Sequence, residues 1–308
     1  MSVQTDVSPI DMTLEPSVSD FIQLMKPRVM TLVVLTALAA MLAAPGPINP
    51  VIGLIAIVSI AIGAGASGAL NMWYDADIDA RMARTAARPL PRGRISGDEA
   101  LTFGTVLSFG SIVTLGVLVN WAAGALLALT IAFYMFVYTM WLKRTTPQNI
   151  VIGGAAGAFP PMVGWAAVTG DISIQSVLLF MIIFLWTPPH FWALALYRCR
   201  DYERVGVPML PVVSGLAETR KQILIYSLLL VPTGIAPYFV GLGGFAYLAA
   251  STGLGAAFLL YAVQVYRTKD EGREADAIAK KLFWFSIIYL YTLFTVLLVE
   301  ASVARWLA

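Results

Sequence analysis

Apolar residues fall into nine long runs along the chain, separated by shorter polar stretches. The runs lie at approximately 28–45, 50–74, 99–118, 121–142, 149–168, 173–197, 221–240, 243–266 and 282–303. Each is close to the ~20 residues that a helix needs to cross the ~30 Å hydrocarbon core of a bilayer. The alternating pattern of strands is absent, and backbone groups in lipid must be hydrogen-bonded within their own segment. The pattern therefore predicts an all-α, polytopic membrane protein with nine transmembrane helices.

The polar connections alternate in charge. Those after the first, third, fifth and seventh runs are short and contain no Lys or Arg. The N-terminal flank and the other four connections hold 19 of the 20 basic residues, which leaves Arg305 for the opposite side. Because Lys and Arg collect in cytoplasmic loops, the pattern predicts a cytoplasmic N-terminus and an outer C-terminus in the cell (inner) membrane.

The N-terminal stretch and the overall composition agree with this prediction. Residues 1–20 contain four acids and no Lys or Arg, unlike a secretory signal sequence. We expect residues 1–22 to form a mobile cytoplasmic tail and residues 23–308 to form a single domain. Hydrophobic residues make up 59% of the chain and charged residues 12%, about half the usual charged fraction of a soluble domain. One cysteine, Cys199, excludes a disulfide framework and argues against a cysteine-based metal site.

Three polar residues mark the cytoplasmic end of the second run. Asn71, Asp75 and Asp79 are four residues apart, so they stack along one helical face with a drift of about 40° per step. Asp77 points elsewhere. Carboxylate and amide oxygens suit Mg2+, which also keeps waters and phosphate oxygens as ligands. A purely structural role is disfavoured, because polar residues at the end of a transmembrane helix are costly unless used.

A cluster of basic residues follows this stack directly. It consists of Arg81, Arg84, Arg88, Arg92 and Arg94. Two carboxylates repel a diphosphate, but Mg2+ can bridge the two and nearby cations complete the neutralisation. A solvated loop that serves only the charge topology is the alternative for these arginines.

A second polar stretch, YRCRDYER at 197–204, lies on the same side of the membrane. At a spacing of four residues, Tyr197 and Asp201 share one helical face, and Arg200 and Arg204 share another. Asp201 is a candidate ligand for a second Mg2+, with an arginine on the departing diphosphate. A charged cap on the end of the helix is the alternative.

The sixth run contains the only histidine, His190, about two turns before Tyr197 and therefore below the polar rim. Pro188 and Pro189 precede it and should kink or interrupt the helix. Ionisable groups at this depth usually face a cavity, so proton transfer is one role for His190 and a satisfied structural residue is the alternative.

The fourth connection and the start of the fifth run read WLKRTTPQNIVIGGAAGAFPPMVGW. Lys143 and Arg144 could pair with anionic groups, although topology alone would also place them on this side. Gly153, Gly154 and Gly157 allow either close helix packing or space for a flat ligand.

Together these stretches resemble the UbiA-type intramembrane prenyltransferases. Asn71, Asp75 and Asp79 are similar to the NxxxDxxxD signature of that family. DIDARMARTAARPLPRG, WLKRTTPQNIVIGGAAGAFPPMVGW, PPHFWALALYR and DYERVGVPMLPVV, in that order, resemble the branch that farnesylates haem. The resemblance extends from about residue 22 over nearly the whole helical region. It implies nine helices around a central cavity capped by the two polar loops.

The resemblance also implies an activity, which is Mg2+-dependent transfer of a farnesyl group from farnesyl diphosphate to the 2-vinyl group of protohaem IX. The products are haem O, destined for a terminal oxidase, and diphosphate. Haem is then a substrate rather than a prosthetic group. Terminal oxidase assembly proteins are candidate partners, membrane lipid surrounds the chain, and no nucleic acid is expected.

Roles for individual residues follow from the same resemblance. The implied catalytic residues are Asp75, Asp79, Asp201 and His190, the last in the haem pocket, where contact with the haem iron is a candidate role beside proton transfer. The implied metal ligands are Asn71, Asp75, Asp79 and Asp201. The implied substrate-binding residues are Asn71, Arg81, Arg84, Arg88, Lys143, Arg144, Tyr197, Arg200 and Arg204. Many relatives carry a second DxxxD, whereas the nearest spacing here is Tyr197-x-x-x-Asp201, which leaves the ligands of a second Mg2+ open.

Three other functions fit parts of the pattern. A UbiA-type enzyme could act on another acceptor, such as the aromatic ring of a quinone precursor, although the haem-type stretches argue against it. A secondary transporter would suit nine helices, but transporters place functional polar groups near the midplane rather than at one edge. A haem-binding assembly factor without catalysis would leave the stack of Asn71, Asp75 and Asp79 unexplained.

Overall fold

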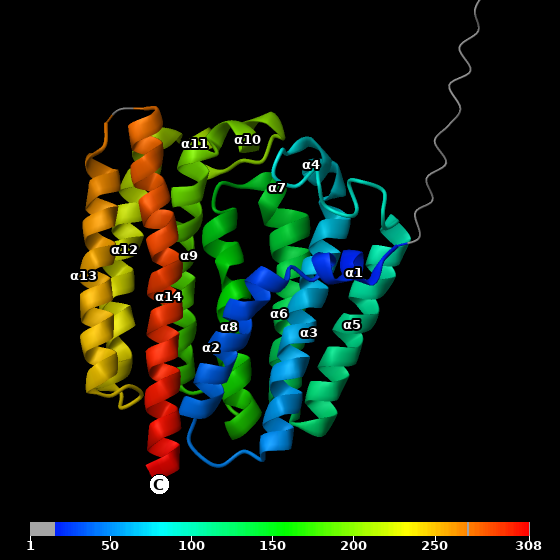
Figure 1. Ribbon diagram of the computed structural model, residues 1–308, viewed down its shortest axis with the longest axis vertical. Helices are drawn as coiled ribbons and strands as arrows, with labels where there is room; N and C mark the ends of the chain where they lie inside the picture. The colour runs from blue at the N-terminus through cyan, green and yellow to red at the C-terminus, as the bar shows by residue number, and fades with distance from the viewer. Residues whose placement is uncertain (1–15, 270, 308) are drawn as a thin grey trace, which may run out of the picture.

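The computed structural model describes residues 16–269 and 271–307, and all the regular secondary-structure elements of these residues are helices (Figure 1). The helices are α1 (Val18–Leu24), α2 (Pro27–Ala43), α3 (Pro50–Tyr74), α4 (Ala76–Arg81), α5 (Gly97–Leu118), α6 (Trp121–Ala132), η1 (Phe133–Leu142), α7 (Lys143–Thr145), α8 (Asn149–Thr169), α9 (Ile174–Tyr197), α10 (Cys199–Arg204), α11 (Leu210–Val213), α12 (Gly215–Phe239), α13 (Phe245–Arg267) and α14 (Arg273–Leu307). Among them, η1 is a π-helix that continues α6. The expected all-α fold is confirmed.

Nine spans account for the long helices of the described residues. Eight are long and apolar enough to cross a membrane by themselves, with α6, η1 and α7 forming one of them from Trp121 to Thr145. The ninth is the pair of α1 and α2, which is long and apolar enough only when the two are taken together and which is bent by 55° between them. The count agrees with the nine apolar runs of the sequence.

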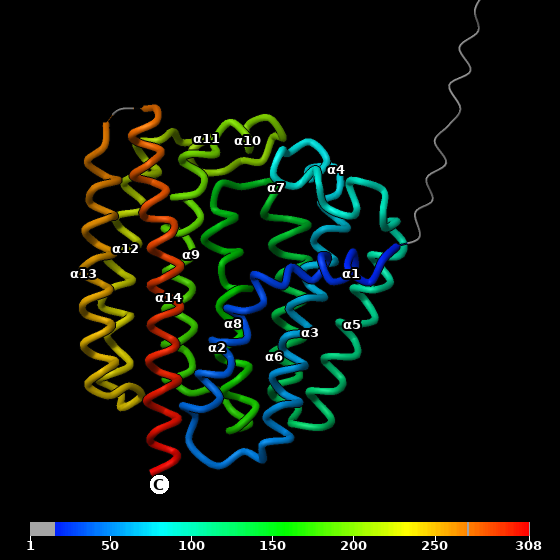
Figure 2. The backbone as a smooth tube through the Cα atoms, in the orientation of Figure 1, coloured from blue at the N-terminus to red at the C-terminus, as the bar shows by residue number. Residues whose placement is uncertain are grey.

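The long helices form two halves that share α2 and α8 (Figure 2). On one side α3, α5 and α6 surround a hydrophobic cluster, and on the other α9, α12, α13 and α14 surround a second one. Because Gly164 of α8 has no side chain, α2 approaches closely: a Cβ there would lie 2.2 Å from the carbonyl oxygen of Ala37. The central cavity that the family resemblance implies stays a prediction.

Two helices are longer than their apolar runs. The predicted starts at 221 and 282 are wrong, since α12 begins at Gly215 and α14 at Arg273. Hydropathy marks only the part of a helix that lies in lipid, and both helices begin with polar turns. Of the expected kink or interruption at Pro188 and Pro189, the interruption is absent, because α9 runs through both prolines; the kink stays a prediction. Neighbouring groups can compensate for the missing amides in a packed transmembrane helix, so prolines are tolerated there.

The N-terminal boundary differs from the expectation as well. Residues 1–15 of the expected tail lie outside the described residues, but α1 already begins at Val18. Ser17 caps this helix by accepting a hydrogen bond from the amide of Asp20 at 3.3 Å. The Asp20 carboxylate in turn pairs with Arg94 at 2.7 Å. A helix therefore already covers residues 18–22 of the expected tail, and the division into a tail and a single domain stays a prediction.

The glycines of α8 divide into two kinds. A Cβ on Gly153 would lie 2.1 Å from the Tyr138 ring, and one on Gly154 would lie 2.9 Å from Thr187 of α9. These two glycines therefore allow close helix packing. A Cβ on Gly157 would meet nothing within 4 Å, so this position borders open space.

Candidate active site

Asn71, Asp75 and Asp79 stack at the end of α3, as their spacing predicts. Asn71 lies in the last turn of α3, Asp75 at the junction, and Asp79 in α4. Helical hydrogen bonds continue across the junction, from the Asp75 amide to the Asn71 carbonyl at 3.0 Å and from the Asp79 amide to the Asp75 carbonyl at 2.8 Å. All three side chains are at most 5% exposed. Two carboxylates and an amide are thus held together in a buried position.

Three side chains orient the Asn71 amide. Its Nδ2 donates to Asp75 Oδ2 at 2.7 Å and to Thr139 Oγ1 at 3.1 Å. Its oxygen accepts a hydrogen bond from Lys26 Nζ at 2.7 Å. Lys26 precedes α2 and has a left-handed backbone with φ of +53°, which is strained for a residue with a side chain. The position of Lys26 is therefore set by its surroundings.

Basic side chains from other elements neutralise both buried carboxylates. Lys143 Nζ pairs with Asp75 Oδ2, and Arg144 lies 3.5 Å from Asp75 Oδ1. Arg88 pairs with Asp79 Oδ2 at 2.5 Å. The Oδ1 atom of Asp75 is buried and has no hydrogen-bond partner among the described residues. An anion that enters this cluster would find cations already gathered there, and a metal ion would find a carboxylate oxygen without a hydrogen bond.

Asp77 lies outside the stack, as expected. Its side chain is 54% exposed and accepts two hydrogen bonds from Arg144, at 2.7 and 3.0 Å. These hydrogen bonds hold the pKa of Asp77 below its usual value. Arg81 and Arg84 are exposed, and Arg81 Nε donates to the Asp77 carbonyl at 3.2 Å.

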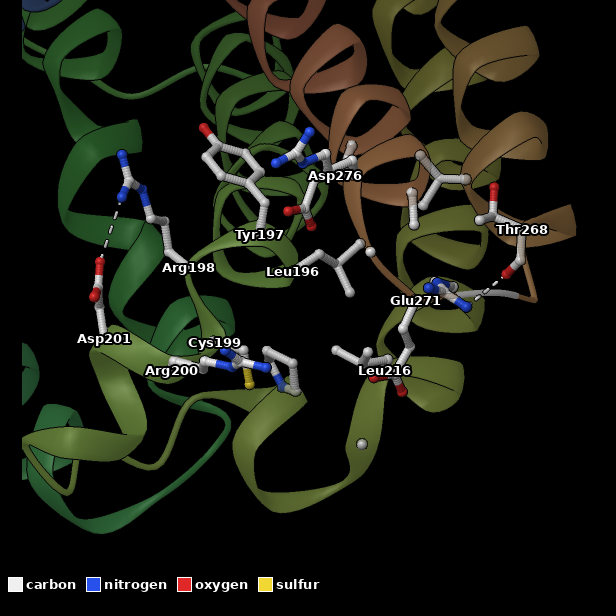
Figure 3. A pocket seen from close by; sticks show the side chains of 18 residues that line it. Leu196, Tyr197, Arg198, Cys199, Arg200, Asp201, Leu216, Thr268, Glu271 and Asp276 are labelled. Carbon is white, nitrogen blue, oxygen red and sulfur yellow. Dashed lines mark hydrogen bonds and ion pairs between the residues drawn. The ribbon is translucent and has the colours of Figure 1, made fainter.

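The second polar loop departs from the expected geometry. Because α9 ends at Tyr197 and α10 begins at Cys199, Tyr197 and Asp201 do not share a helical face. Asp201 lies 3.6 Å from Arg198 and borders a cavity of about 720 Å³ between the ends of α9, α12 and α14 (Figure 3). Arg200 and Arg204 are exposed on α10.

Asp201 is also separate from the first stack. No group of three or more Asp, Glu, His or Cys side chains that could hold a metal ion occurs in residues 16–269 and 271–307. A site formed jointly by Asp75, Asp79 and Asp201 is therefore not preformed, and the role of Asp201 stays a prediction.

The two polar loops nevertheless pack together as one cap. Five of their residues belong to one buried hydrophobic cluster: Ile78, Met82, Val205, Val207 and Met209. Burial raises the pKa of the Tyr202 hydroxyl, and the nearby Arg84 guanidinium partly offsets that rise. Arg84 of the first loop therefore faces the second loop, which brings arginines of both loops to the same end of the bundle.

His190 lies deeper, at the interface of α9 with α14. It is 8% exposed, and its ring stacks on those of Trp186 and Phe283, with distances of 4.2 Å and 4.7 Å between ring centroids. Its Nδ1 atom lies 2.6 Å from Ser286 Oγ. Two aromatic rings and a serine hydroxyl thus hold this imidazole in place.

Three contacts of these residues could not be expected from the sequence. Lys26 looked like one more basic residue flanking the first span, and Thr139 and Ser286 looked like ordinary small residues inside apolar runs. The only local signal is that Lys26 directly precedes Pro27, a residue favoured at the start of a helix.

The sequence model of the UbiA prenyltransferase family matches residues 32–288, which is most of the chain. The chain belongs to the UbiA prenyltransferase family. It is therefore a membrane-embedded prenyltransferase. Two relatives within this family share 64% identity (Parvibaculum lavamentivorans; 92% of this chain and 89% of the relative) and 60% identity (Beijerinckia indica; 92% and 88%). Both carry the name protoheme IX farnesyltransferase.

Solved structures of UbiA proteins share the fold. A structure described for digeranylgeranylglyceryl phosphate synthase superimposes with a TM-score of 0.75 at 18% identity, covering 92% of this chain and 98% of the other. A UbiA homologue from Archaeoglobus fulgidus, bound to GPP and Mg2+, superimposes with a TM-score of 0.69 at 16% identity, covering 90% and 99%. At these identities the likeness establishes the UbiA fold alone.

Proposed function

We propose that this UbiA-family chain transfers a farnesyl group from farnesyl diphosphate to the 2-vinyl group of protohaem IX. The observation that carries the proposal is the buried stack of Asn71, Asp75 and Asp79, ringed by basic side chains from other elements. The acceptor is proposed from the name of the relatives, which are up to 64% identical over most of the chain.

The donor atoms of the stack fit Mg2+. Asp75 offers a buried Oδ1 without a hydrogen-bond partner, Asp79 a second carboxylate and Asn71 an amide oxygen. Oxygen ligands, together with waters and substrate phosphates, are the set that Mg2+ prefers. When bound, Mg2+ would neutralise charge on the diphosphate. The homologue solved with GPP and Mg2+ supports this assignment.

The basic residues would then hold the leaving group. Lys26, Arg88 and Lys143 contact Asn71, Asp79 and Asp75 respectively, and each can exchange this partner for a phosphate oxygen. Such cations stabilise charge most strongly where water is excluded. Arg84 and the arginines of the second loop, Arg200 and Arg204, would extend the positive potential over the entrance.

The bond changes follow from the substrates. The C1–O bond of farnesyl diphosphate breaks, and its electron pair leaves with the diphosphate. The vinyl π electrons of protohaem form the new bond to C1, water adds to the resulting cation, and the water gives up one proton. The stacked Tyr134–Tyr138 pair on η1, 5.4 Å between ring centroids, could stabilise the allylic cation through its ring faces. The packed cap would keep out water that otherwise quenches the cation.

We further propose that the chain lies in the cell inner membrane with its N-terminus in the cytoplasm. The segregation of 19 of 20 basic residues to one side supports this orientation. Terminal oxidase assembly proteins are the proposed partners, because haem O would have to be delivered to an oxidase.

The decisive assay uses membranes that contain the full chain, protohaem IX, labelled farnesyl diphosphate and Mg2+. We expect a haem product with the mass of haem O and release of diphosphate, both lost when the metal is chelated. An aromatic-acid acceptor tested in parallel separates this activity from that of a quinone-type enzyme. Prenylation of the aromatic acid but not of protohaem would reject the proposed acceptor and keep the family assignment.

A further inference from the structure

His190 and Ser286 meet across the interface of α9 and α14. Ser286 is fully buried and His190 is 8% exposed. Trp186 covers one face of the imidazole with an interplanar angle of 15°, and Phe283 stacks on it at 22°. Because aromatic rings stack on the imidazole, its chemistry with any other molecule must take place at the ring edge, where its two nitrogens lie.

The hydrogen bonds of Ser286 determine which nitrogen carries the proton. Ser286 Oγ lies 2.6 Å from the carbonyl oxygen of Phe283 and 2.6 Å from His190 Nδ1. A carbonyl oxygen has no proton to give, so the single hydroxyl proton of Ser286 points to Phe283. Ser286 Oγ is then an acceptor towards the ring, and the proton of that hydrogen bond belongs to Nδ1.

The other ring nitrogen consequently bears a lone pair. In a neutral imidazole with Nδ1–H, Nε2 is the acceptor. No acidic side chain is paired with His190 in the described part of the chain, and burial among aromatic rings disfavours a charged ring. No described residue forms a hydrogen bond with Nε2, and the described residues do not bury this atom completely.

A second contact fixes Ser286 in place. The Trp186 indole N–H donates to the Ser286 carbonyl at 2.7 Å. Two side chains of α9, one turn apart, therefore hold the backbone and the hydroxyl of the same residue of α14. An imidazole whose Nδ1–H is held by such a partner, with Nε2 free, is the arrangement by which proteins present histidine to a metal ion.

We infer that Ser286 is a positioning residue, whose hydroxyl holds the Nδ1–H of His190 so that Nε2 serves as an axial ligand to the iron of protohaem. This inference rests on the proposed function only in taking protohaem as the acceptor. Iron ligation would fix the haem relative to α9 and so determine which edge of the macrocycle reaches the farnesyl cation.

The test adds protohaem IX to the purified full-length chain and records the Soret spectrum, the affinity and the iron–histidine stretch of the ferrous complex. The variants are His190→Gly, with and without added imidazole, Ser286→Ala and Ser286→Thr. Ser227→Ala is the matched control, because Ser227 is equally buried in α12 and donates to the Ile223 carbonyl at 2.6 Å but does not contact His190.

We expect the wild type, Ser227→Ala and Ser286→Thr to give the iron–histidine signature. Ser286→Ala should lower haem affinity by about 10–100-fold, the usual effect of removing the partner of a metal-bound histidine. His190→Gly should lose the signature and regain it with imidazole. The inference is overturned if His190→Gly keeps the wild-type signature, or if Ser286→Ala and Ser227→Ala lose equal affinity.

Farnesyl transfer, measured on the same preparations, keeps the two proposals apart. A wild-type chain that farnesylates protohaem without an iron–histidine signature would overturn the ligand role and leave the proposed function standing. A chain that shows the iron–histidine signature but transfers no farnesyl group would overturn the proposed function and leave the ligand role standing.

Discussion

Replacing Asp75 with Asn tests the proposed site most directly. The amide has nearly the shape of the carboxylate, so the change removes one charge from a side chain that is 1% exposed. Lys143 and Arg144 then lose their buried counter-charge, while the hydrogen bonding around Asn71 has to rearrange. Both stability and catalysis should respond, by different amounts.

The expected magnitudes follow from burial and charge. Removing one partner of a fully buried ion pair costs about 3–5 kcal/mol. Because Lys143 and Arg144 keep 19% and 33% of their side-chain surface exposed, we expect a smaller loss of stability, about 2–3 kcal/mol. A carboxylate about 4 Å from a bound cation contributes about 4 kcal/mol at an effective dielectric of about 20. Farnesyl transfer should therefore fall by about 10³-fold.

Asp77→Asn is the matched control, because it makes the same chemical change two residues away. Asp77 is also paired with Arg144, but it is 54% exposed and lies outside the stack. An exposed pair contributes about 0.2–1 kcal/mol, so this variant should keep the wild-type rate to within about threefold. Unfolding can be followed through tryptophan fluorescence in detergent, since the chain has eight Trp residues.

Diphosphate binding, measured with and without Mg2+, separates a metal ligand from a simple ion-pair partner. The wild type should bind diphosphate more tightly when Mg2+ is present. In Asp75→Asn this dependence should be lost, while metal-free binding is kept or strengthened, because the site becomes more positive. Near-wild-type transfer in this variant, unchanged dependence on Mg2+, or equal losses in Asp75→Asn and Asp77→Asn would refute the reasoning.

Two further predictions concern residues whose surroundings only the structure reveals. Lys26→Met should raise the KM for farnesyl diphosphate by about 10–100-fold, because the loss of one charge-assisted hydrogen bond weakens binding by about that factor. Arg28→Met changes an exposed basic residue on the same flank and should leave the KM unchanged in the same assay. In a melting experiment, Gly153→Ala should destabilise the protein by about 1–3 kcal/mol, because the new Cβ would overlap the Tyr138 ring. Gly157→Ala, whose Cβ meets no atom within 4 Å, should stabilise the protein by about 0.5–1 kcal/mol. Equal effects of the two changes would contradict the packing argument.

The sequence by itself determined the membrane fold, the number of spans and the first stack. Hydropathy follows from the partition of side chains into lipid, and the spacing of Asn71, Asp75 and Asp79 follows from helical geometry. Both are local properties, so they could be read without knowing how the helices pack. The same local reasoning failed for Tyr197 and Asp201, because a helix break at Arg198 leaves no mark in the spacing of residues.

The tertiary structure alone decided which side chains meet the stack and the histidine. Lys26 contacts Asn71 across 45 residues of sequence, Lys143 contacts Asp75 across 68, and His190 contacts Ser286 across 96. Such contacts depend on how each helix is rotated and placed against its neighbours. In lipid this placement is set by close packing and hydrogen bonds between helices rather than by apolar patterning, because every face of a transmembrane helix is already apolar.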